Sequence, residues 1–126
     1  YPYWEELIAM IDEPIIQVGG SGEKQLVPDF RQNPDLALLK SLIQESKTWI
    51  SVDSFFQHFA WDQGKRGIVL WSKSDPEVFG HPENINLLKS RDYLRSNQFL
   101  WWEDEAYNPK AFVEPEFVIE SLKLLV

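Results

Sequence analysis

The chain has 126 residues, 44% of them hydrophobic and 25% charged, which is typical of one globular domain with its own core. The absence of cysteine excludes disulfides, thiolate chemistry and sulfur-ligated metal sites, and it is compatible with the cytoplasm. A net charge of −8 argues against nucleic-acid binding, which depends on neutralising phosphates with lysine and arginine.

The N-terminal segment places apolar residues at the spacing of one helical face: Trp4, Leu7, Ile8 and Ile11. We therefore predict an amphipathic helix over residues 3–12, which Pro14 ends. Residues 15–18 form an apolar run that predicts a strand, and this strand leads into a glycine-rich loop over 19–23. A polar stretch then extends to about Gln32.

The pair Asn33-Pro34 has the pattern of a helix start, with Asn33 as N-cap and Pro34 at the first helical position. The predicted helix spans residues 34–45. Its buried face is expected to carry four apolar residues: Leu36, Leu39, Leu42 and Ile43.

Residues 48–52 are rich in β-forming residues and predict the second strand. The next helix is expected over 54–63, where Gly64 closes it. Residues 67–71 predict a third strand, and its continuous apolar character is typical of a strand covered on both faces.

The last third begins with a loop over 72–83 that is rich in serine, proline, glycine and aspartate. Residues 84–88 and 98–102 are the candidates for a fourth and a fifth strand. Pro115 starts a final helix, and four apolar residues are expected on its inner side: Phe117, Val118, Leu122 and Leu125.

Strands that alternate with helices of about ten residues indicate βαβ units and a mainly parallel sheet. Right-handed crossovers then give a three-layer, Rossmann-like α/β sandwich, formed by residues 1–126 as a single domain. Ligands of such sheets bind at the carboxyl ends of the strands. Three loops meet that condition, at 19–23, 53–55 and 72–76.

The turn at Asp53-Ser54 joins a buried strand to a helix start. Ser54 and Gln57 have the spacing of a capping box, which would define the first helical turn. The amide N–H groups of Ser54, Phe55 and Phe56 would then point outward and, with the helix dipole, favour an anion such as phosphate. Capping alone explains the same residues equally well.

His58 lies one turn further along, on the same face as Ser54, from where it could donate to a phosphate or a sugar hydroxyl. A structural role is the alternative for a single histidine on a helix. Asp53 is acidic and would not favour phosphate directly, but its carboxylate could accept hydrogen bonds from sugar hydroxyls or brace the turn.

The other two loops carry weaker signals. Gly19 and Gly20 permit close approach of a ligand, and Glu23 could bind ribose hydroxyls. The loop matches neither G-x-G-x-x-G nor a Walker loop, however, so a flexible crossover is favoured over an independent phosphate loop. Lys73 and Ser74 could contact phosphate, although Asp75-Pro76 also marks an ordinary solvated turn.

Several chemistries are disfavoured. His58 and His81 with scattered carboxylates are too few for a metal site, and Ser54 lacks the flanking glycines of a nucleophile elbow. Trp101-Trp102 is expected in the core or at a domain interface, and the acidic run 103–105 on a solvated surface.

The segment from Trp49 to His58, followed by a helix, Gly64-Lys65, an apolar strand and Ser74-Asp75-Pro76, resembles the C-terminal half of heptosyltransferase-like glycosyltransferases. These are two-domain enzymes of the GT-B type, in family 9 of the glycosyltransferases. The resemblance covers about residues 1–80. The chain departs from the family pattern at Phe55-Phe56, where small residues are usual, so the sugar donor stays open.

The resemblance implies a nucleotide-sugar site on the following residues: Gly19, Gly20, Glu23, Asn33, Asp53, Ser54, Phe55, Phe56, Gln57, His58, Ser74 and Asp75. Within it, Ser54 and the Phe55-Phe56 backbone would hold the diphosphate. Asp53 would contact the transferred sugar, with support from His58. The two groups from the first half of the chain would serve the nucleoside: Glu23 on the ribose and Asn33 beside the base.

The resemblance further implies a donor that is ADP-linked by default, no cofactor or metal, and no catalytic residue in this chain. The general base of this family lies in an N-terminal acceptor domain. Because the chain starts at Tyr1, we expect that such a portion is missing. The acceptor, a glycan or a lipid-linked sugar, would reach the site through that domain, and this half alone would be inactive.

The main alternative is a non-enzymatic Rossmann-like module for protein–protein contacts, with an exposed aromatic patch around Trp101-Trp102. A Rossmann-like oxidoreductase fits less well, because the glycine fingerprint is missing. No signal peptide is visible, and the longest apolar runs, such as 68–71, are too short for a transmembrane segment.

Overall fold

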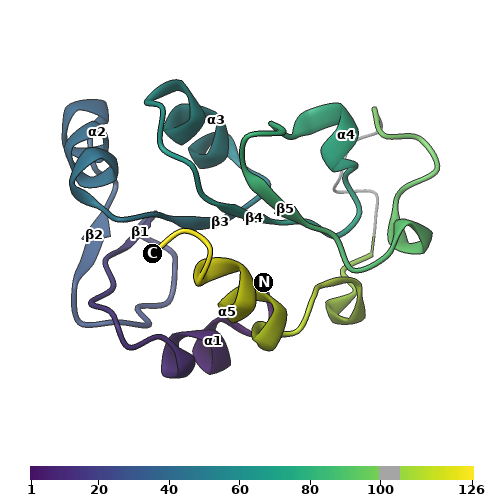
Figure 1. Ribbon diagram of the computed structural model, residues 1–126, viewed down its shortest axis with the longest axis horizontal. Coiled ribbons are helices and arrows are strands. Elements are labelled where there is room, and N and C mark those ends of the chain that lie inside the picture. The colour runs from purple at the N-terminus through teal and green to yellow at the C-terminus, as the bar shows by residue number, and fades with distance from the viewer. Residues whose placement is uncertain (100–105) are drawn as a thin grey trace.

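Helices and strands alternate along most of the chain in the computed structural model, which describes residues 1–99 and 106–126 (Figure 1). The elements are α1 (Trp4–Met10), β1 (Gln17–Gly19), β2 (Phe30–Gln32), α2 (Leu36–Glu45), β3 (Ile50–Val52), α3 (Phe55–Asp62), β4 (Ile68–Leu70), α4 (Pro76–Phe79), β5 (Ile85–Leu87) and α5 (Pro115–Leu122). Short 3₁₀ turns lie at Arg91–Tyr93 and Pro109–Ala111.

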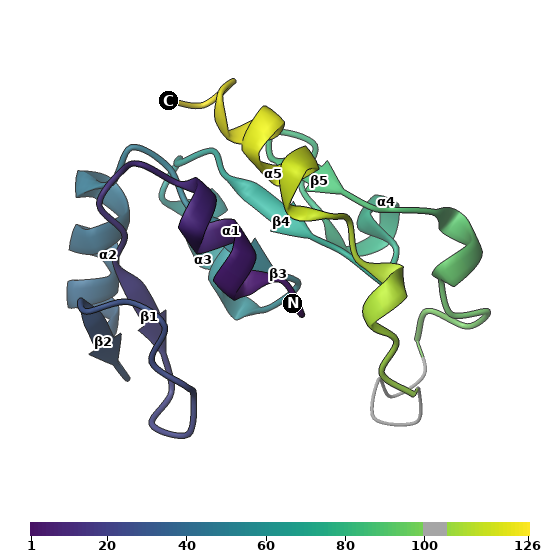
Figure 2. The same ribbon diagram turned by 90° about the horizontal axis from the view of Figure 1, so that it is seen from below.

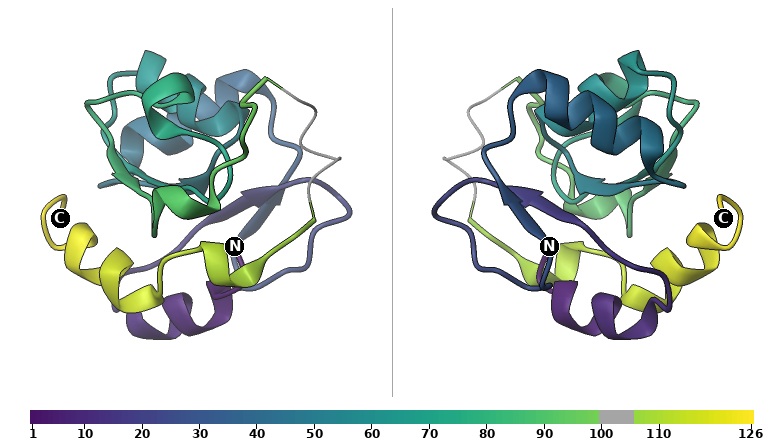
Figure 3. Two further views of the ribbon diagram at one scale, coloured as in Figure 1. Left: turned by 90° about the vertical axis from the view of Figure 1, so that its right-hand side faces the viewer. Right: turned by 90° about the vertical axis from the view of Figure 1, so that its left-hand side faces the viewer.

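All strand pairs of the described residues are parallel. β1 pairs with β2 in one small sheet, and β3, β4 and β5 pair in that order in a second sheet. Helices α2 and α3 cover one side of the strands, and α1 and α5 lie together on the other side (Figures 2 and 3). The predicted α/β class with a mainly parallel sheet and a layered, Rossmann-like arrangement is therefore confirmed.

The central strand β4 explains why the layers hold together. Its residues are fully buried, and successive side chains point to opposite faces of the sheet. Val69 packs with residues of α2 and α3, including Leu39 and Ala60. Ile68 and Leu70 pack on the opposite face, in a second apolar cluster that includes Leu7 of α1 and Val118 of α5: Leu7, Ile68, Leu70, Val113 and Val118.

The start of α2 differs from the prediction. Asn33 adopts a left-handed conformation with φ of 45° and donates its N–H to the carbonyl of Gly19 at 2.8 Å. The N-cap is Asp35, whose carboxylate accepts from the N–H of Leu38 at 2.8 Å. Asn33 follows the last residue of β2 and bonds back to Gly19. The next residue with a capping side chain, Asp35, therefore caps the helix. Leu36, predicted to be buried, is exposed because it lies in the first turn.

The start of α3 is also different. Ser54 is the N-cap residue, but its side chain makes no capping hydrogen bond, so the predicted capping box is wrong. Gln57 instead donates from Nε2 to Oδ1 of Asp53 at 2.7 Å. The prediction for the other end is confirmed, since Gly64 follows the helix with φ of 77°, where a glycine is favoured.

Other differences concern short elements. β2 and α4 fall in segments that were predicted as loops, because strands and helices of three or four residues carry no periodic pattern. Gln98 and Phe99 lie in a turn and not in a strand, while 100–102 lie outside the described residues. On α5, Val118 is buried but Phe117 points to solvent. No helix of the described residues is long and apolar enough to cross a membrane.

Candidate functional site

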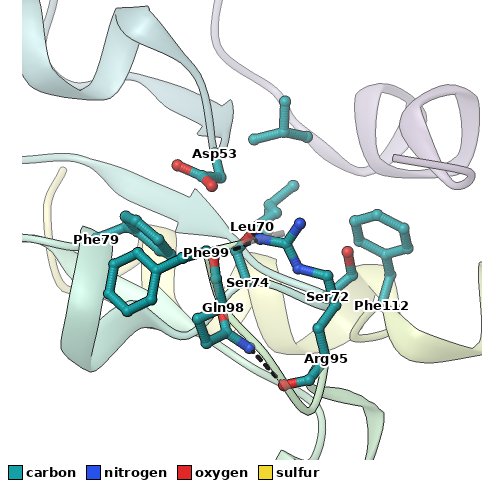
Figure 4. Close-up of a pocket in the computed structure, with 10 residues that line it drawn as sticks. Asp53, Leu70, Ser72, Ser74, Phe79, Arg95, Gln98, Phe99 and Phe112 are labelled. Atoms are coloured by element: carbon teal, nitrogen blue, oxygen red, sulfur yellow. Dashed lines mark hydrogen bonds between the residues drawn. The ribbon is translucent and has the colours of Figure 1, made fainter. Parts of the chain in front are cut away.

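A pocket of about 630 Å³ opens at the carboxyl ends of β3 and β4, where parallel sheets bind their ligands (Figure 4). Its lining combines strand ends with the chain that follows them: Val52, Asp53, Leu70, Ser72, Ser74, Phe79, Arg95, Gln98, Phe99 and Phe112. A second hollow of about 200 Å³ shares Ser72, Ser74, Arg95 and Phe112 with it and adds Lys73 and Tyr107. The two hollows are therefore neighbours, and their linings include both polar and aromatic residues.

Asp53 supplies the carboxylate of the pocket. It follows β3 directly and points toward the residues contributed by the 95–99 segment (Figure 4). The residue as a whole is exposed, yet its carboxyl group lies partly desolvated, and this burial raises the pKa of Asp53 above its usual range. The Gln57 amide, the Ser74 hydroxyl and the charges of His58 and Arg95 counteract the rise in pKa by favouring the ionised form.

Arg95 and Gln98 hold their segment against the loop after β4. Arg95 donates from Nη2 to Ser74 Oγ and to the carbonyl of Gln98, each at 3.2 Å. Gln98 accepts from the N–H of Asp75 at 2.7 Å and donates to the carbonyl of Lys73 at 3.0 Å. These contacts bring a guanidinium and a hydroxyl together, which is a pairing suited to an anionic or polyhydroxylated ligand.

Aromatic rings form the apolar side. Phe79 of α4 and Phe99 meet edge to face with centroids 6.1 Å apart, and Phe112 lies across the pocket from them (Figure 4). Phe99 lines the pocket and is 82% exposed, so most of a large apolar ring faces solvent there. Rings of this kind offer a flat face to a nucleobase or to the apolar face of a sugar.

Of the residues predicted from the sequence, Asp53 and Ser74 line this pocket. The residues of α3 are spread over different environments. Phe55 is exposed, whereas Phe56 packs edge to face on Trp49. Among the described residues, no protein group accepts from the N–H of Ser54, Phe55 or Phe56.

His58 is not a lining residue of the pocket and belongs to a cluster of its own. Its Nδ1 lies 2.8 Å from Nε2 of His81, and the His81 ring stacks on Trp61 with centroids 4.2 Å apart. The T-shaped pair of imidazoles ties α3 to the turn after α4. His58 therefore acts on the pocket through its charge near Asp53 and not through a contact with the lining.

Gly19, Gly20, Glu23 and Asn33 come together at the carboxyl ends of β1 and β2, outside the pocket lining. The Glu23 carboxylate lies over Gly19, where an added Cβ would be 2.2 Å from Oε2. The hydrogen bond from the Asn33 N–H to the Gly19 carbonyl holds Asn33 beside these residues. The predicted nucleoside residues, Glu23 and Asn33, thus follow strands of one sheet, and the predicted sugar residue Asp53 follows a strand of the other.

Asp75 lies beside the pocket residues but serves the fold. It is 7% exposed, caps α4 by accepting from the N–H of Glu77 at 2.9 Å, and binds Arg91 through two hydrogen bonds of 3.2 and 2.7 Å. These donors engage both carboxylate oxygens. A ligand contact by Asp75 would therefore compete with its structural partners.

The Asp75–Arg91 pair predicts an acid-sensitive contribution to stability. The Arg91 hydrogen bonds, followed by the Glu77 N–H, hold the pKa of Asp75 below its usual range. A lowered pKa in the folded state stabilises the fold above the unfolded value, near pH 3.9, and this contribution disappears as the pH falls through the folded value. Asp75→Asn is expected to lower the urea midpoint at neutral pH and to differ much less from the parent chain near about pH 3.

The matched control is Asp62→Asn, which removes an exposed carboxylate at the end of α3. It is expected to leave the urea midpoint unchanged at both pH values. A gap between Asp75→Asn and the parent chain that stays constant on acidification would contradict the ion-pair explanation.

Two residues of the site, Arg95 and Gln98, and the rings of Phe99 and Phe112 were not predicted from the sequence. These residues lie in irregular segments, for which hydrophobic periodicity makes no prediction. Only the folded chain places them against the ends of β3 and β4. The acidic run 103–105 and Trp101-Trp102 lie outside the described residues. Within residues 1–99 and 106–126, no group of three or more histidine or acidic side chains is placed to hold a metal ion.

Comparison of the chain with models of known protein families, with curated proteins and with solved structures found no match.

Proposed function

We propose that the pocket binds a nucleotide sugar and that the chain is the donor-binding half of a GT-B glycosyltransferase. The observation that carries the proposal is the composition of the pocket at the carboxyl ends of β3 and β4. It combines a carboxylate, Asp53, with hydroxyl and guanidinium groups from Ser74 and Arg95, and it is walled by phenylalanine rings. A nucleotide sugar needs all three kinds of contact.

The charges suggest how the donor lies. Its sugar hydroxyls donate to the Asp53 carboxylate, and its diphosphate makes no direct contact with that carboxylate, since two negative charges at contact distance repel. The diphosphate is assigned to Ser74, Arg95 and the N–H groups at the start of α3. Glu23 and Asn33, on the neighbouring sheet, remain candidates for the nucleoside, with ADP as the default donor nucleotide.

Transfer requires a second domain under this proposal. The general base and the acceptor, a glycan or a lipid-linked sugar, come from that domain, and closure of the two halves positions the sugar and stabilises the leaving diphosphate. The chain by itself is expected to bind donor and to show no transferase activity.

Calorimetry tests the proposal with ADP, GDP and UDP and with one sugar conjugate of each. The parent chain is expected to bind at least one conjugate. Asp53→Asn keeps the size of the side chain but removes its charge, and it should weaken that binding by about tenfold or more, because hydrogen bonds to charged groups are the strong ones. Asp62→Asn is the control and should leave the affinity unchanged. The absence of binding to every nucleotide and conjugate would reject the proposed function.

A further inference from the structure

The Gln57 side chain is a buried polar group next to the pocket, and one of its polar atoms has no partner in the described part of the fold. It lies on the inner side of α3 with no exposed surface, in a position where an apolar residue would pack. Its Nε2 donates to Asp53 Oδ1 at 2.7 Å. Its Oε1 is buried without a hydrogen-bond partner among the described residues.

This arrangement is unfavourable for stability alone. A glutamine at the third position of a helix can turn back so that its Oε1 accepts a hydrogen bond from the N-cap N–H. Both the side-chain oxygen and the helix-end N–H then have a partner. Here that option is not used, and a buried oxygen is left unpaired, which lowers stability. An apolar side chain of similar length would fill the same volume without an unpaired polar atom. The bond to Asp53 is therefore the feature that distinguishes glutamine here.

That bond acts on a pocket group. Desolvation of the Asp53 carboxyl disfavours its charge, and the Gln57 amide is the largest of the influences that restore it. The same bond fixes Oδ1 of Asp53, which is itself a lining residue of the pocket. Ser74 and Arg95 line the same pocket and also favour the ionised form of Asp53.

We propose that Gln57 is a positioning residue, which orients the Asp53 carboxylate so that it accepts hydrogen bonds from the sugar hydroxyls of the donor. This inference rests on the proposed function and assigns Gln57 to one part of the ligand. The sugar part of the affinity depends on the Gln57–Asp53 pair, and the nucleoside diphosphate part does not, since the diphosphate makes no direct contact with the Asp53 carboxylate.

The test is Gln57→Met, which keeps the length of the side chain and removes both polar atoms. Affinities are measured for ADP, GDP and UDP and for ADP-glucose, GDP-mannose and UDP-glucose. The ratio of conjugate affinity to diphosphate affinity is expected to fall about tenfold, while the diphosphate affinity changes by less than about twofold. Gln63→Met, the same substitution at the other end of α3, should change neither affinity. In an Asp53→Asn background, Gln57→Met should have no further effect on the ratio.

The titration of Asp53 distinguishes the positioning role of Gln57 from a purely structural one. It is monitored through the carboxyl ¹³C chemical shift of Asp53 in NMR spectra. Loss of the Gln57 donor destabilises the charged form, so the pKa of Asp53 should rise further in Gln57→Met, and the sugar preference of any residual binding should be lost at a higher pH than in the parent chain. The melting temperature should stay the same or rise, because the unpaired buried oxygen is gone.

The outcomes separate the two proposals. An unchanged Asp53 midpoint in a folded Gln57→Met variant would overturn the positioning role by itself. Binding with an undiminished ratio of conjugate to diphosphate affinity would overturn it as well and leave the proposed function standing. If the parent chain binds a nucleoside diphosphate but no conjugate, the sugar contact is overturned. If it binds neither, the proposed function is rejected as well. Should Gln57→Met not fold, the same comparisons are made with Gln57→Leu.

Discussion

Gly67→Ala is expected to lower the free energy of unfolding by about 3 kcal/mol, at the upper end of the range for overpacked sites. Gly67 precedes β4, and a Cβ added to it would lie 2.2 Å from two ring atoms of Trp49 and 2.7 Å from a third. Trp49 cannot easily move away, because it is buried and donates from Nε1 to the carbonyl of Lys65 at 2.9 Å. Urea unfolding of the purified variant measures the loss.

Gly22→Ala is the matched control for this prediction. No atom lies within 4 Å of a Cβ built on Gly22, and its backbone is not in the left-handed region. Its effect on the free energy of unfolding should stay within about 0.5 kcal/mol. Equal stability of the Gly67 and Gly22 variants would show that the Trp49 ring does not rest on the Gly67 backbone.

Trp71→Ala is expected to cost about 3–5 kcal/mol, a large share of the stability of an ordinary domain. Trp71 is 1% exposed, packs in the cluster beneath α2 and α3, and donates from Nε1 to Asn86 Oδ1 at 2.9 Å. Its ring also lies against Gly80, just after α4. Because Phe79 of α4 lines the pocket, the variant should lose ligand binding together with stability.

The control for Trp71 is another tryptophan. Trp61 is 42% exposed, and its main contact is the stack on His81, so Trp61→Ala should cost about 1 kcal/mol. Thermal unfolding and calorimetry on both variants decide the question. A Trp61 variant that is as unstable as the Trp71 variant would place the important packing on the α3 surface and not under the sheet.

Most of the long elements could be predicted from the sequence. The apolar run at 68–70 indicated a strand covered on both faces, and β4 is buried on both. The periodic faces of α1 and α5 were indicated by Leu7 and Val118, which are both fully buried. These predictions succeed because burial of an apolar face is a property of many residues together, so a single wrong residue such as Phe117 does not obscure it.

Predictions that depended on one side chain were less successful. Asn33 and Gln57 both matched capping patterns, yet Asn33 closes β2 and Gln57 binds Asp53. A side chain of this kind has several possible partners at similar cost, and the choice among them depends on which atoms the fold brings near. The same reason kept Arg95 and Phe99 from being predicted as pocket residues.

The sequence by itself determined the α/β class, the parallel sheet and the edge at which Asp53 and Ser74 would be found, because hydrophobic periodicity and chain order suffice for these. Only the tertiary structure decided which groups share the pocket. The association of Asp53 with Arg95, and the burial of Gln57 behind Asp53, arise from contacts between residues that are distant in sequence or from a side chain turning inward. Such contacts depend on the packed positions of whole elements, which no local pattern encodes.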